Sequence, residues 1–121
     1  MHALNIPTTR ALAAVSTGDT VYRDTSFPGG ILTRVAKSHV RIGTFEYFAS
    51  LNDFESVQTL SDYCINRLYP DCLNSTDKYL TFLKSVVEKQ INLIAKWMSV
   101  GFIHGVMNTD NISISGETID F

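Results

Sequence analysis

The sequence has 121 residues, the length of one small domain. Ten Lys and Arg side chains against twelve Asp and Glu give a formal net charge of -2, which excludes a general nucleic-acid binder, because such proteins are normally basic. Hydrophobic residues make up 45% and charged residues 18%, a composition that excludes a disordered chain. No apolar run approaches the ~18–20 residues of a membrane span, and two cysteines do not indicate a disulfide scaffold.

The first third of the chain predicts short strands. Small and apolar residues form a strand over 11–16, turn chemistry follows at 17–19, and a second short strand is expected over 20–23. Residues 26–30, Ser-Phe-Pro-Gly-Gly, predict a loop, because Pro and Gly disfavour regular elements. Alternating residues over 31–36 predict a third strand with two distinct faces.

Two helices are predicted in the middle of the chain. The first begins at a capping residue, Asn52 or Asp53, and ends at Pro70. The second begins within 74–77 and runs to about Val100. The predicted apolar stripe of the first helix is Val57, Leu60, Cys64 and Leu68. The predicted buried face of the second is Leu80, Leu83, Val87, Ile91, Ile94 and Met98, widened by Val86, Leu93 and Trp97.

The tail predicts a tight β-hairpin, with apolar residues at 112–114 and 118–119 on either side of Ser115-Gly116. Strands, then helices, then a hairpin indicate an α+β fold.

Three oxygen-bearing side chains flank the predicted hairpin. Asp110 and Asn111 precede it, and Asp120 follows it, so the fold-back of the hairpin is expected to bring Asp120 close to Asn111. Mg²⁺ prefers such oxygen ligands and takes few from the protein when phosphates supply the rest. A carboxylate left over can accept a proton from an attacking hydroxyl. The alternative is turn chemistry alone, because Asx residues favour such positions.

Residues 104–111, His-Gly-Val-Met-Asn-Thr-Asp-Asn, resemble the catalytic loop of the protein-kinase-like fold. Val106 stands where that fold ordinarily has an Asp, and Asp110 directly precedes Asn111. This departure is similar to the signature of the selenoprotein O (YdiU) family, which are pseudokinase-like protein adenylyltransferases.

Two further stretches resemble the same family, and the three matches occur in the family's order. They are Asn-Ile-Pro-Thr-Thr-Arg-Ala-Leu at 5–12 and Leu-Thr-Arg-Val-Ala-Lys-Ser-His-Val-Arg-Ile-Gly-Thr-Phe at 32–45. The resemblance implies part of a kinase-like fold. Residues 1–50 would form the end of the small lobe, with antiparallel strands, and residues 51–121 the start of the helical large lobe, with the catalytic-loop hairpin.

The resemblance also implies an activity. Family members bind ATP in a flipped orientation, with Mg²⁺ or Mn²⁺, and transfer AMP to Ser, Thr or Tyr hydroxyls of proteins. They are cytoplasmic in bacteria and mitochondrial in eukaryotes. By match to the family's motifs, Asp110 would be the general base, Asn111 and Asp120 the metal ligands, with Asp120 also at the nucleotide. Arg34 and Arg41 would hold the inward phosphates, which suits guanidinium groups. The alternative for both arginines is an exposed, salt-bridging strand.

Other parts of a kinase-like domain are not found in these residues. The chain has no glycine-rich loop before a helix and no Lys before Lys37, and it stops at Phe121, before the Gly of an Asp-Phe-Gly segment. A fragment that is inactive by itself is therefore expected. Two alternatives stay open: an ATP-dependent phosphotransferase of the same fold, and a non-catalytic nucleotide-binding pseudokinase module.

Three further residues are given structural roles. His104 is expected to brace its loop, Cys64 to lie in the core, and Cys72 to be a plain loop thiol.

Overall fold

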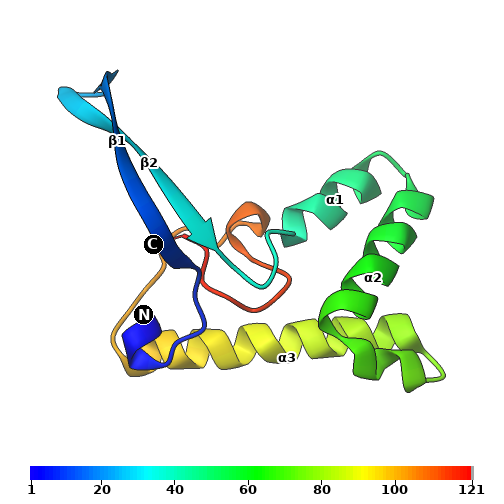
Figure 1. The fold of residues 1–121 in the computed structure, drawn as a ribbon. Coiled ribbons are helices and arrows are strands. Elements are labelled where there is room, and N and C mark those ends of the chain that lie inside the picture. Colours follow the sequence, from blue (N-terminus) through cyan, green and yellow to red (C-terminus); the bar gives the residue numbers. More distant parts are fainter. Residues whose placement is uncertain (121) are drawn as a thin grey trace.

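The computed structural model describes residues 1–120, and Phe121 lies outside the described residues. Two antiparallel strands and three helices form an α+β architecture, as predicted (Figure 1). The elements are β1 (Arg10–Tyr22), β2 (Ser26–Val35), α1 (Ile42–Ser50), α2 (Phe54–Leu68) and α3 (Lys78–Ser99), with short 3₁₀ turns η1 (His2–Leu4), η2 (Pro70–Asn74) and η3 (Thr109–Asn111). Within residues 1–120, none of the helices combines the length and hydrophobicity of a transmembrane segment.

The strands form one long ribbon instead of the three short strands predicted. Ser16 pairs with Gly30 and Thr20 pairs with Pro28, so residues 17–19 lie opposite a single residue. The predicted turn at 17–19 is therefore a bulge within β1. The chain reverses only afterwards, between Tyr22 and Ser26, which are paired.

The predicted loop at 26–30 is wrong, because these residues form the start of β2. Gly29 lies opposite the bulge, where a Cβ atom would come within 2.7 Å of Thr17 Oγ1. Glycine is required there by this close approach rather than by a turn. Pro28 is tolerated because each strand of a two-stranded ribbon has a free edge. Apart from Gly29, every residue of the ribbon is exposed, and Figure 1 shows the ribbon projecting away from the helices.

Both predicted helices are present and begin at acidic caps. The Asp53 carboxylate accepts a hydrogen bond from Ser56 N at 3.0 Å, and that of Asp77 accepts one from Leu80 N at 3.1 Å. Gly101 follows α3 with a φ of 75°, the left-handed conformation that ends a helix. The helix α1 was not predicted.

The core lies where α2, α3 and the C-terminal segment meet. Its main cluster consists of Cys64, Ile65, Tyr69, Cys72, Phe82, Val86 and Ile114. A second cluster of Ile6, Leu93 and Trp97 joins the N-terminal residues to α3. Cys64 is in the core as predicted. Cys72 is a free thiol in the turn η2, between α2 and α3, and its side chain is also buried.

The predicted buried face of α3 is also wrong. Its core side chains are Phe82, Val86, Leu93 and Trp97, of which three were expected only at the margin. Most of the predicted stripe is exposed, namely Leu80, Leu83, Val87, Ile91 and Met98, and Ile94 is partly buried. Apolar residues cover more than half of the circumference of α3, so periodicity does not determine which side is buried.

The C-terminal segment is buried from Ser113 to Ile119 and joins distant parts of the chain. The predicted hairpin is reduced to one antiparallel bridge, between Ile112 and Thr118. Other backbone bonds leave the segment: Ile114 N donates to Val40 O at 3.0 Å, and Thr118 N donates to Pro7 O at 2.9 Å.

Candidate functional site

The loop that carries Asp110 and Asn111 is held by its own polar groups. Asn111 N donates to Asn108 Oδ1 at 3.1 Å, which caps the turn η3. Asn111 Nδ2 donates to Val106 O at 2.9 Å, so the loop uses the nitrogen of this amide. The amide oxygen of Asn111 lies on the other side of the same planar group. It can therefore accept a hydrogen bond or coordinate a cation.

The same loop rests on the first turn of α1. Thr109 Oγ1 donates to Glu46 Oε2 at 2.5 Å. A Cβ atom on Gly43 would overlap Asp110 Oδ1, so only glycine allows this carboxylate to lie where it does. The positive end of a helix favours a carboxylate beside it. Asp110 is nevertheless exposed, which leaves it accessible to a hydroxyl group from another molecule.

Arg41 lies at the same place in the fold. It is the N-cap of α1, with an extended backbone, and its backbone forms an antiparallel bridge with Ser113. Its side chain is exposed. Arg41 therefore precedes the helix whose second residue, Gly43, lies against Asp110.

Arg34 is placed differently from Arg41. Its Nε and Nη2 donate to Thr9 Oγ1 at 3.2 Å and 3.0 Å, and Nη2 also donates to the carbonyl oxygen of Ile119. The guanidinium thus fastens the end of β2 to the residue before Asp120. The other terminal nitrogen, Nη1, takes no part in these three bonds, so its two N–H groups remain for an anion.

Asp120 is exposed and follows the buried segment directly. The bridge between Ile112 and Thr118 runs the two arms of the tail antiparallel, so Asn111 and Asp120 leave it at the same end.

These side chains fit a divalent cation only in part. Among residues 1–120, no group of three or more His, Cys, Asp or Glu side chains is arranged to hold a metal ion. The Asn111 amide oxygen and the Asp120 carboxylate are of the kind that Mg²⁺ takes as ligands, and Mg²⁺ completes sites with few protein ligands through phosphate and water oxygens. The donor set therefore suits a cation that arrives with a phosphate-bearing ligand.

His104 braces the loop, as predicted, and is not placed as a base. Its ring lies 5.4 Å from that of Trp97 and 6.1 Å from that of Phe102, centroid to centroid. Its Nδ1 accepts from Val106 N at 3.3 Å. Its Nε2 is buried without a hydrogen-bond partner among residues 1–120.

Two contributors to the site were missed from the sequence. Gly43 makes room for Asp110, and Glu46 receives the hydrogen bond of Thr109. Gly43 lies within the stretch 32–45 already singled out, but only the contact with a loop far along the chain shows what it does.

Known proteins are similar to this chain over its whole length. The family described as Protein adenylyltransferase SelO matches residues 1–121. The protein nucleotidyltransferase YdiU of Rhizobium meliloti is 60% identical over 121 residues, and those of Agrobacterium fabrum and Bacillus cereus are each 59% identical. Each alignment covers 100% of this chain and 25% of the relative, so the chain spans about a quarter of the length of these bacterial relatives.

Proposed function

Since the chain belongs to the protein adenylyltransferase SelO family, we propose that it forms the part of a nucleotidyltransferase that carries the catalytic loop. The complete enzyme transfers AMP from ATP to Ser, Thr or Tyr hydroxyls of proteins. Its fold is protein-kinase-like, with residues 1–50 at the end of the small lobe and 51–121 at the start of the large lobe. Because the chain spans about a quarter of its relatives, we propose that it is inactive alone.

The placement of Asp110 carries this proposal. Its carboxylate lies at the start of α1, against Gly43, and is open to solvent, and Arg41 is the N-cap of the same helix. A carboxylate that acts as a general base must be accessible to the acceptor hydroxyl. The reaction also needs a cationic group nearby that stabilises the negative charge of the phosphates. Both are present at this helix end.

The reaction assigns a task to each predicted side chain. Asp110 accepts the proton of the acceptor hydroxyl, whose oxygen bonds to the α-phosphorus of ATP. The bond from that phosphorus to the bridging oxygen breaks, and pyrophosphate leaves with the electron pair. Arg41 and the two remaining N–H groups of Arg34 hold the terminal phosphates. Mg²⁺ or Mn²⁺, held by Asn111 and Asp120, would neutralise phosphate charge.

A chimera tests the proposal. The matching quarter of the Rhizobium meliloti relative is replaced by these 121 residues, and a protein acceptor is incubated with ATP labelled at the α-phosphate. We expect label in the acceptor. Asp110→Asn is expected to lower the transfer rate by about 10²–10⁴-fold, the usual contribution of a general base.

Asp71→Asn is the matched control. Asp71 is exposed on η2, so this substitution removes the same charge at a position away from the candidate site. Its transfer rate should equal that of the parent chimera. Label transferred only from the γ-phosphate would show a phosphotransferase instead. Nucleotide binding without transfer, unchanged by Asp120→Ala, would show a non-catalytic module.

A further inference from the structure

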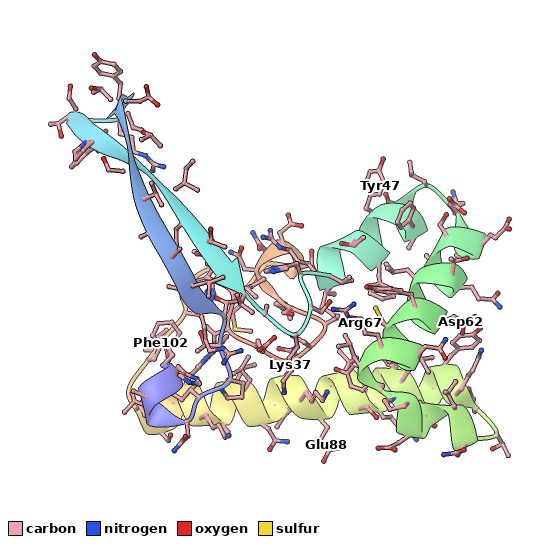
Figure 2. The ribbon with its side chains drawn as sticks, in the orientation of Figure 1. Lys37, Tyr47, Asp62, Arg67, Glu88 and Phe102 are labelled. Atoms are coloured by element: carbon pink, nitrogen blue, oxygen red, sulfur yellow. The ribbon has the colours of Figure 1, made fainter. Side chains whose placement is uncertain are left out.

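Three basic side chains converge outside the candidate site. Lys37 comes from the connection between β2 and α1, Arg67 from the last turn of α2, and Lys89 from the middle of α3. With Leu68 and Ser115 they line a hollow of about 380 Å³, here called the basic pocket. Figure 2 shows Lys37 and Arg67 in the space between the base of the ribbon, α2 and α3.

Packing holds Lys89 in this position. Its stem crosses the turn at Gly116, where a Cβ atom would come within 2.9 Å of Lys89 Cβ. Gly116 is also left-handed, with a φ of 75°, so a side chain is disfavoured there on both counts. The Lys89 ammonium lies 3.9 Å from the centroid of the Tyr69 ring, a cation–π contact. Tyr69 is itself fixed, because its hydroxyl donates to Ile114 O.

The basic pocket has an excess of positive charge. Among residues 1–120 the ion pair found is Lys78 with Asp62, so Lys37, Arg67 and Lys89 have no carboxylate at ion-pair distance. Partial burial and the charge of Lys37 lower the pKa of Lys89 from its ordinary value.

The neighbouring carboxylate of Glu117 offsets only part of this excess. Glu117 is buried, and its Oε2 accepts from Lys37 N at 2.8 Å and from the Ser115 hydroxyl at 2.9 Å. One negative charge, already bound by two donors, therefore faces three cations. Such a hollow attracts small anions.

We propose that the basic pocket binds a phosphate-type oxyanion, as inorganic phosphate or as pyrophosphate. A guanidinium and two ammonium groups from three separate segments of the chain match the several oxygens of such an anion. The positive charge excludes a metal ion, and the polar lining excludes an apolar ligand. Nucleotidyl transfer releases pyrophosphate, which gives one source, but the inference stands on the pocket and not on the proposed activity.

Thermal melts of the 121-residue chain test the inference. Sodium chloride is replaced by phosphate or by pyrophosphate at constant ionic strength, and Tm is followed as the anion increases. We expect a saturable rise, of about 5 °C or more at ten times Kd, because the ligand binds only the folded chain. The anion that saturates at the lower concentration is the preferred source.

Lys89→Gln separates binding from stability. Without phosphate this variant should melt close to the parent, because it loses both the repulsion from Lys37 and the cation–π contact with Tyr69, which act in opposite directions. Its anion-dependent rise in Tm should be lost. Lys84→Gln, the same change at an exposed position on α3 outside the pocket, should keep the rise.

An equal rise in all three chains would show a general salt effect and overturn the inference. No rise in the parent would overturn it as well. If a chain does not unfold cooperatively on heating, equilibrium dialysis with radiolabelled phosphate or pyrophosphate measures anion binding directly. Saturable binding that Lys89→Gln loses and Lys84→Gln keeps supports the basic pocket, and any other pattern rejects it.

Discussion

The absence of a side chain at Gly43, in the first turn of α1, allows the candidate base Asp110 to lie where it does. The missing Cβ leaves room for Asp110 Oδ1, and Thr109 beside it is tied to Glu46 on the same helix. The loop geometry therefore depends on two residues of α1 that carry no chemistry of their own. Such positioning is costly to disturb, because a shift of about 1 Å can lower a reaction rate by about 10²-fold.

Gly43→Ala tests this dependence. Alanine favours a helix over glycine by about 1 kcal/mol, so the substitution should not weaken α1. Its Cβ must displace Asp110, and we expect AMP transfer by the chimera to fall by about 10²-fold with Tm unchanged or higher. Gly30→Ala in the ribbon is the control and should leave transfer intact, since its Cβ would lie 3.4 Å from Val15 O. Undiminished transfer in Gly43→Ala would contradict the role given to Gly43.

Among the elements, α3 carries apolar residues on two sides, and its neighbours select the buried one. Tyr69 and Ile114 contact the side that bears Phe82 and Val86. Ile6 covers Leu93 further along the same side. The other apolar side remains exposed among residues 1–120.

A pair of alanine substitutions distinguishes the two sides of α3. Leu93→Ala removes a buried side chain and should lower the free energy of unfolding by about 2–5 kcal/mol. Ile91→Ala, two residues away and exposed, should change it by less than about 0.5 kcal/mol. Urea unfolding of the 121-residue chain measures both values. Equal losses would show that the side predicted from the sequence is buried after all.

At the scale of the whole molecule, the tail from Ser113 to Ile119 connects the ribbon, the helices and the N-terminal residues. Trp97 Nε1 donates to Thr118 Oγ1 at 2.9 Å, and Gln90 Nε2 donates to Ser113 O at 2.8 Å. Arg34 attaches the base of the ribbon to Ile119. Apart from Gly29, the residues of the ribbon are exposed.

Hydrogen exchange should reflect this division. The amides of Ile114 and Thr118, bonded to Val40 O and Pro7 O, should be among the slowest to exchange. Amides of residues 20–27, at the far end of the ribbon, should exchange at least about 10²-fold faster. Exchange of the intact chain, followed by mass spectrometry, checks this order. Uniform protection of ribbon and tail would contradict it.

The sequence by itself determined the features that depend on near neighbours. The caps at Asp53 and Asp77 act on backbone amides three residues away, and Gly101 ends α3 through its own φ. The stretch 104–111 was recognisable because its residue types follow one another directly. Short-range hydrogen bonds and backbone preferences are local, so they can be read without the fold.

Only the tertiary structure decided how these parts meet. Arg34 reaches a carbonyl 85 residues away, and Lys37 reaches Glu117 across 80 residues. The buried side of α3, the room at Gly43 and the basic pocket likewise depend on which distant segments pack together. Which side chains are buried, and which charges lie close together, depends on how distant segments pack against one another. The same local sequence pattern is compatible with several such arrangements. The small net charge that excluded a nucleic-acid binder therefore hid a locally positive hollow.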